Sequence, residues 1–190
     1  MIRNTPRKLF ACRTILLTLA MLPFVLTQAH AQCDPHSANP PSPPAQASVT
    51  LNGKSVTIDY CAPSMRGRKI FGALIPYNHW WRTGANTSTT LKTETDLRIG
   101  TLTVPAGTYS IYSIPSAGVW KLIVNKQTGQ WGTVYKPEMD LGRVDMHKGE
   151  TPSSPVETFK ITFENTAGNK TQLHLIWENA NVYVPVEAVK

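Results

Sequence analysis

Residues Ser48–Tyr60 read SVTLNGKSVTIDY, and this stretch decides the fold class. Its centre is Asn52-Gly53, a pair typical of the tight turn that joins two antiparallel strands. After the turn, the apolar residues Val56, Ile58 and Tyr60 alternate with polar ones. This period of two is that of a strand with one face buried and one face in solvent. The stretch therefore predicts a β-hairpin that covers an apolar core.

The same short alternation recurs along the rest of the chain. Further strands are predicted at residues 79–83, 89–95, 97–104, 108–114, 119–124, 159–164, 170–178 and 182–186, with a weak one at 132–135. Residues 125–154 are otherwise predicted as loop, and a short helical turn near residues 69–74 is the most helix expected. About nine or ten short strands with frequent turns predict an all-β antiparallel β-sandwich, jelly-roll-like in character. Pro185 predicts an edge position for the last strand.

The N-terminus has the pattern of a secretory signal peptide over residues 1–31. An apolar stretch, Ile15–Leu26, is shorter than the roughly 20 residues of a membrane span, and small residues follow at Ala29-His30-Ala31. Its basic residues are Arg3, Arg7, Lys8 and Arg13. Cleavage before Gln32 would leave a periplasmic or secreted protein without an integral membrane segment.

Removal of this leader changes the charge argument. The leader contributes four basic residues and no acidic residue to the formal charge of +7. The mature chain therefore carries only +3. We therefore expect no nucleic-acid partner, since no cluster of Lys and Arg remains. Residues 32–46 are rich in proline and predict an extended linker that does not pair in a sheet. Residues 47–190 are long enough for a single β-sandwich domain, and the sequence does not predict its oligomeric state.

Two cysteines, Cys33 and Cys61, remain after the predicted cleavage, because Cys12 lies in the leader. In an oxidising compartment we expect them to form a disulfide that ties the linker to the domain. Closing this loop would stabilise the fold by roughly 3–4 kcal/mol. The alternative is a free thiol in the linker and a buried Cys61.

The densest chemistry lies in WWRTGANTSTT, residues Trp80–Thr90. The guanidinium of Arg82 can stack on the indole of Trp81 and still offer its fork to a carboxylate or phosphate. Gly84 allows close approach of a ligand, and Asn86 offers a donor and an acceptor. The pattern predicts a pocket for a small polar, anionic or glycan ligand. The predicted ligand-binding residues are Arg66, Arg68, Trp81, Arg82 and Asn86.

Two alternatives stay open at this stretch. Arg82 can instead be buried in an ion pair with Asp59 or Glu178, which would make the stretch a well-tied turn in a structural or protein-interaction module. An enzyme of hydrolase type would use Asp59 or Glu178 as acid or base.

Catalytic and metal-binding patterns are sparse. The sequence contains no G-x-S-x-G elbow for a serine nucleophile. The histidines of the mature chain have no metal-ligand spacing, so neither a metal nor a cofactor is predicted. These histidines are His36, His79, His147 and His174. We favour a non-catalytic binding protein and leave enzymatic activity open.

The tryptophans divide into two groups. Trp120 and Trp177 fall within predicted strands and are expected to fill the core. Trp131 follows KQTGQ in a polar segment and is expected to be exposed, where its ring would be available to stack on a sugar.

Several segments together resemble one known family. YCAPSMRGRKIFG (60–72) and WRTGAN (81–86) are followed by PAGTY (105–109), the Trp120 strand and Trp177-Glu178. In this order they resemble the secreted bacterial proteins called domain of unknown function 2911, over residues 45–188. The resemblance implies export and a shared fold, but no activity, since none is established for that family.

Overall fold

The structure is a computed structural model that describes residue 1, residue 33 and residues 41–189. It is an all-β sandwich of two antiparallel sheets, as the sequence predicts. The first sheet has the order β1-β2-β3-β6-β7-β8: Pro44–Leu51, Lys54–Cys61, Thr89–Thr93, Gly107–Ile114, Lys121–Asn125 and Asp140–Asp145. The second has the order β10-β11-β12-β4-β5: Val156–Ala167, Lys170–Glu178, Ala180–Ala188, Leu97–Ile99 and Leu102–Val104. In that sheet β9, His147–Lys148, also pairs with β12.

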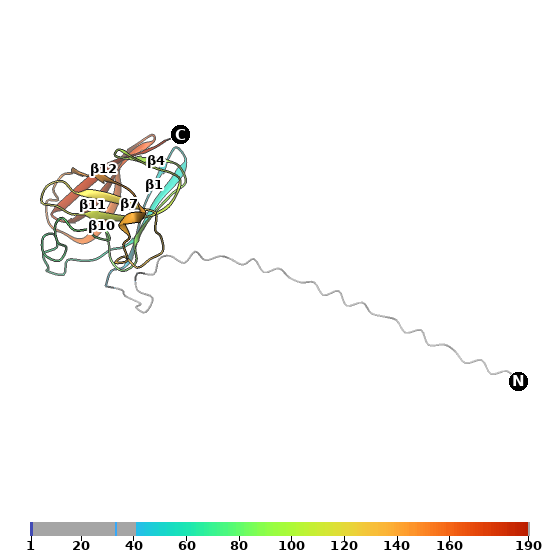
Figure 1. Cartoon of the computed structure of the whole chain (residues 1–190), viewed down its shortest axis with the longest axis horizontal. Coiled ribbons are helices and arrows are strands. Elements are labelled where there is room, and N and C mark those ends of the chain that lie inside the picture. The colour runs from blue at the N-terminus through green and yellow to red at the C-terminus, as the bar shows by residue number, and fades with distance from the viewer. Residues whose placement is uncertain (2–32, 34–40, 190) are drawn as a thin grey trace.

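The core lies between the two sheets and follows from the period of two. In β2, Val56 and Ile58 are fully buried while their polar neighbours are not. The predicted Asn52-Gly53 turn joins β1 to β2, with Leu51 paired to Lys54. Leu175 and Val184 of the second sheet belong to the same buried cluster. The end of β12 pairs with β4, so the C-terminal strand joins β10 and β11 to β4 and β5 in one sheet (Figure 1).

An aromatic cluster fills one end of the core. Phe71, which comes from the long β2–β3 connection, packs edge-on against Trp81, Trp120 and Trp177 with ring centroids 4.6–6.0 Å apart. Phe159 of β10 joins the cluster, 5.0 Å from Trp81. The prediction that Trp120 and Trp177 are core residues is confirmed, since they are 5% and 2% exposed. The cluster anchors the β2–β3 connection to both sheets.

Some local predictions are wrong. Residues 79–83 and 132–135 are not strands, and Trp81 makes only an isolated bridge to Ser113. Strand β8 lies in the region predicted as loop, because its alternation is hidden among charges and a glycine. Residues 69–74 form a hydrogen-bonded turn, which is within the predicted limit of one short helical turn. Within the described residues the helical element is the 3-10 turn Pro137–Met139.

The edge position predicted from Pro185 is also wrong. Strand β12 lies between β11 and β4, and Pro185 pairs with Gln172 of β11. The carbonyl oxygen of Pro185 accepts a hydrogen bond from the Gly100 N–H, just past the end of β4. The nitrogen and oxygen of one strand residue face the same side, so the missing N–H of Pro185 faces the place where β4 turns away. A proline is therefore tolerated inside this sheet.

The linker prediction fails at its last residues. Strand β1 begins at Pro44, and Pro44, Ala45 and Gln46 pair with β2. An edge strand bonds on one side only, which allows a proline in it. Residues 2–31 of the predicted signal peptide lie outside the described residues. In the part of the chain that the structure describes, no helix is long and apolar enough to cross a bilayer.

Candidate functional site

The predicted ligand-binding stretch lines a cavity of about 440 Å³, which we call the Arg82 cavity. Its charged or ionisable lining residues are Arg68, His79 and Arg82. The Arg68 guanidinium already donates to the carbonyls of Ser64 and Met65. Asn86 and Thr133 add polar groups. Its apolar wall is formed by Leu74, Ile75, Pro76, Trp80, Trp81 and Trp177. No Asp or Glu is among the described residues that line it, so nothing in the lining neutralises the two arginines.

Arg82 is the most constrained cation of this cavity. Its Nε is buried and has no hydrogen-bond partner among the described residues. Burial lowers the pKa of the Arg82 guanidinium from its usual value. Its aliphatic stem packs beneath Gly132, where an added Cβ would stand 2.5 Å from the Arg82 Cδ. The side chain is therefore held in place by packing rather than by an opposite charge.

The ion pair considered for Arg82 is not formed. Asp59 instead contacts Lys92 Nζ at 3.1 Å and accepts a hydrogen bond from Gln46 at 2.6 Å. Glu178 accepts a hydrogen bond from the Phe71 N–H at 3.2 Å. The two acids line different cavities, so the structure does not bring them together as a catalytic pair.

The backbone beside Arg82 has a rare conformation. Thr83 is fully buried and has a φ of 52°, in the left-handed region that β-branched residues rarely enter. Its hydroxyl donates to Ser113 Oγ at 2.9 Å, and its carbonyl accepts from the Thr89 hydroxyl at 2.7 Å. Such a conformation persists only where its surroundings hold it, and it is found most often at functional sites.

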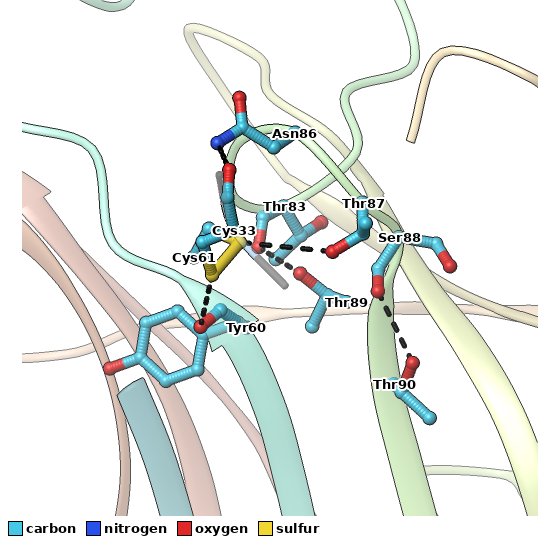
Figure 2. The surroundings of a disulfide bond; sticks show 9 residues. All are labelled: Cys33, Tyr60, Cys61, Thr83, Asn86, Thr87, Ser88, Thr89 and Thr90. Carbon is cyan, nitrogen blue, oxygen red and sulfur yellow. Dashed lines mark hydrogen bonds between the residues drawn. A yellow bond between two sulfur atoms is a disulfide. The ribbon is translucent and has the colours of Figure 1, made fainter. Parts of the chain in front are cut away.

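The predicted disulfide between Cys33 and Cys61 is confirmed, with Cα atoms 5.5 Å apart. It supports the loop that follows Arg82. The Ala85 N–H donates to the Cys61 carbonyl at 3.1 Å, and Ala85 packs against both cysteines. Figure 2 shows Asn86 standing over Cys33, whose carbonyl accepts a hydrogen bond from the Asn86 amide. A side chain at Gly84 would meet the Cys61 carbonyl at 3.1 Å, so the loop lies directly on the disulfide.

The structure places four of the five predicted ligand-binding residues around the Arg82 cavity and one outside it. Arg68, Trp81, Arg82 and Asn86 all line the cavity. Arg66 does not line it, and its guanidinium donates to the Pro41 carbonyl at 3.0 Å. This placement follows from the turn at Arg66, whose φ is 50°. The Asn86 amide nitrogen is already engaged by Cys33.

Sequence reasoning missed other parts of the cavity. His79 was assigned to a strand, although its position beside Trp80 and Trp81 was a signal for the cavity wall. Nothing in the local sequence indicated that Gly132 lies beside Arg82, because the two residues belong to segments about fifty residues apart in the chain. Trp131 is 49% exposed, as predicted, but does not line the Arg82 cavity.

A second cavity of about 470 Å³ lies on the other side of Phe71, and we call it the Glu178 cavity. Lys69, Lys148 and Glu178 line it together with Phe71 and Trp120. Glu178, the last residue of β11, forms with Asn179 the turn between the paired residues Trp177 and Ala180, and its φ of 54° favours glycine. Among the described residues, no three His, Cys, Asp or Glu side chains gather as metal ligands in either cavity or elsewhere.

The fold and cavities define the class of protein as a single antiparallel β-sandwich with a disulfide-braced, cationic cavity at one end. The chain belongs to the family described as protein of unknown function DUF2911, whose model matches residues 42–186. Neither a curated protein nor a solved structure shows significant similarity to the chain.

Proposed function

We propose that this protein is an exported binding protein that holds a small anionic ligand in the Arg82 cavity. The single observation that carries the proposal is the half-buried Arg82 guanidinium, which has no carboxylate partner among the described residues. A buried charge without a partner is costly, so proteins normally pair it. A carboxylate or phosphate from a ligand would supply the missing partner.

The lining supports an anion rather than a cation or a neutral sugar. Two arginines and one histidine line the cavity, and its described lining has no acid. A guanidinium can bind a carboxylate or phosphate through two parallel hydrogen bonds. The Arg82 Nε is buried and has no hydrogen-bond partner among the described residues.

Export is part of the proposal. The disulfide between Cys33 and Cys61 is consistent with an oxidising compartment outside the cytoplasm. The leader-like pattern of residues 1–31 supports the same location. The periplasm and full secretion are both compatible with it.

No catalytic role is proposed for the Arg82 cavity. The two acids considered for hydrolysis, Asp59 and Glu178, do not line it. Asp59 is already paired with Lys92 on the outer face of the first sheet. Glu178 faces the second cavity, where Lys69 and Lys148 also lie.

The test is titration calorimetry of purified residues 32–190 with inorganic phosphate and acetate, at low ionic strength. We expect binding by the parent protein and an affinity about 10- to 100-fold weaker in Arg82→Ala, since the variant loses a charge-assisted bond. Arg82→Lys should restore only part of the affinity because lysine lacks the fork.

The matched control is Arg66→Ala, which removes the same kind of charge from the same loop region but outside the cavity. Its affinity should equal that of the parent. Equal losses in Arg66→Ala and Arg82→Ala would reduce binding to general surface charge and would overturn the proposed site. No binding of either anion by the parent would overturn the proposed function itself.

A further inference from the structure

We infer that the ligand of the Arg82 cavity is amphiphilic: an anionic head group attached to an aliphatic or aromatic body. This inference rests on the proposed function and deepens it. It follows from how the lining divides by chemistry, from the size of the cavity and from one exposed apolar residue at its margin.

The lining divides into a cationic part and an apolar part. Arg68 and Arg82 supply the cationic part, and no acid stands between them among the described lining residues. The apolar part includes Leu74, Ile75 and Pro76 of the β2–β3 connection. The head group of one ligand can therefore meet the guanidinium groups while its body covers the apolar wall, an arrangement common in small-molecule sites.

The cavity is larger than a bare anion needs. A volume of about 440 Å³ equals roughly fifteen water molecules at about 30 Å³ each. A phosphate or carboxylate group alone would leave most of the apolar wall in contact with water. Burying that wall against a ligand body is favourable in proportion to the area covered.

Leu74 is exposed although its side chain is large and apolar. It is 49% exposed, whereas its neighbour Ile75 in the same wall is 8% exposed. The turn that presents Leu74 is fixed, because the Ile75 N–H donates to the Ile70 carbonyl at 2.9 Å. A ligand body lying on this wall would remove the Leu74 side chain from water.

The aromatic wall is rigid, although it offers a ligand little surface. Trp81 stacks on Trp177 with ring centroids 5.8 Å apart and planes inclined by 22°. Both indoles line the cavity and are almost fully buried, so their position is set by the core and not by a ligand. A rigid, preformed apolar surface reduces the ordering cost of binding.

The experiment is calorimetric titration of residues 32–190 with acetate, butanoate, hexanoate and octanoate, all below their aggregation concentrations. The head group stays the same while the body grows. A methylene that becomes fully buried should lower Kd about fourfold, so we expect roughly a 15-fold gain for each two-carbon step until the wall is covered.

Two variants distinguish the contribution of the head group to affinity from that of the ligand body. Arg82→Ala should weaken every member of the series by about the same factor and leave the gain per step unchanged. Leu74→Ser should reduce the gain per step, so that it weakens octanoate binding much more than acetate binding. Val119→Ser is the matched control, since Val119 is 59% exposed at the Glu178 cavity and should change neither quantity.

The outcomes separate this inference from the proposed function. Equal affinities for acetate and octanoate, both lost in Arg82→Ala, would overturn the amphiphile and retain the anion site. A gain per step that Val119→Ser reduces as much as Leu74→Ser would also overturn the inference, because the chains would then be binding to exposed apolar surface in general. Absence of binding by every acid and by phosphate would overturn both.

Discussion

The Arg82 cavity and the Glu178 cavity are similar in size but differ in charge. Both lie at the same end of the sandwich, on either side of the aromatic cluster, with volumes of about 440 and 470 Å³. Two arginines and, among the described residues, no acid line the first, whereas Lys69, Lys148 and Glu178 line the second. One carboxylate offsets part of the charge of the two lysines in the Glu178 cavity, whereas the described lining of the Arg82 cavity offers none. The comparison therefore points to the Arg82 cavity as the place where a ligand supplies the missing charge.

The two cavities also differ in how they are held. The disulfide supports the loop after Arg82 through the Cys33 and Cys61 carbonyls. The Glu178 cavity depends on a turn tied to Phe71 by one hydrogen bond of 3.2 Å. Changes made to one cavity should thus leave the other intact, and four predictions test this separation.

The largest effect is expected from removal of the disulfide by Cys33→Ala together with Cys61→Ala. The free energy of unfolding should fall by about 3 kcal/mol, because the unfolded chain regains the freedom of the closed loop. Urea unfolding measures it. Acetate binding should weaken as well, since Asn86 and Ala85 lose their anchors. An unchanged unfolding midpoint and unchanged affinity would show that the disulfide does not brace the Arg82 cavity.

The next effect is steric and compares Gly132, which packs against the Arg82 stem, with Gly118 of the Glu178 cavity. Gly132→Ala would place a methyl group 2.5 Å from Arg82 Cδ and 2.7 Å from the Asn86 carbonyl oxygen. We expect a loss of about 1–3 kcal/mol in unfolding free energy and weaker anion binding, because Arg82 must move. Thermal unfolding and calorimetry measure the two effects.

Gly118→Ala is the matched control at the Glu178 cavity. The nearest atom to its added methyl group would be Ser116 Oγ at 3.8 Å. Stability should therefore change by less than about 0.5 kcal/mol and anion affinity should stay the same. Similar losses in the two glycine variants would contradict the close packing of Arg82 under Gly132.

A smaller effect on stability is expected at Glu178. Its positive φ destabilises the fold, whereas the hydrogen bond that it accepts from the Phe71 N–H stabilises it. Glu178→Ala removes the acceptor of the Phe71 N–H and keeps the positive φ, so it should cost about 1 kcal/mol or slightly more. Glu178→Gly removes the same acceptor but relieves the backbone, and its cost should be lower by roughly 1 kcal/mol. Urea unfolding of both variants gives the difference.

Anion affinity at the Arg82 cavity should be the same in both Glu178 variants and in the parent. A loss of affinity in either one would mean that the two cavities are coupled through Phe71. Equal stability of the alanine and glycine variants would show that the positive φ at Glu178 costs nothing.

The smallest effect is a pH dependence carried by Tyr135, whose ring lies 5.0 Å from that of Trp80 in the wall of the Arg82 cavity. Burial, together with the hydrogen bond to Asp140, raises the pKa of Tyr135 to about 12. A raised pKa means that the protonated phenol is favoured in the folded state. Its contribution is complete below the unfolded pKa of about 10 and is lost as the pH rises toward 12.

Ultraviolet titration of the phenolate, with unfolding measured at several alkaline pH values, tests this prediction. Tyr135→Phe should show a weaker loss of stability at high pH. Tyr183→Phe is the control, because Tyr183 stacks on His174 in the second sheet and lies outside the Tyr135–Asp140 cluster. A Tyr135 phenolate that forms near pH 10 would contradict the buried hydrogen bond.

The sequence by itself determined the fold class, the first hairpin and the partners of the disulfide. Alternation with a period of two and an Asn-Gly turn are local features, and strand pairing next to a turn needs no information from the rest of the chain. Only two cysteines remain outside the predicted leader, so their pairing needed no choice among partners. The same local reasoning failed for β8, whose apolar positions are too few to show the period.

Only the tertiary structure decided what surrounds Arg82. The sequence allowed Arg82 either an ion pair with Asp59 or Glu178 or a place in a ligand-binding site, because it does not show which segments meet. Folding brings Gly132 over the Arg82 stem, pairs Asp59 with Lys92 and turns Glu178 toward Phe71. Folding also places the Arg66 guanidinium outside the Arg82 cavity, where it donates to the Pro41 carbonyl. The charge balance of a cavity depends on contacts between distant segments, and so it is fixed by packing rather than by local sequence.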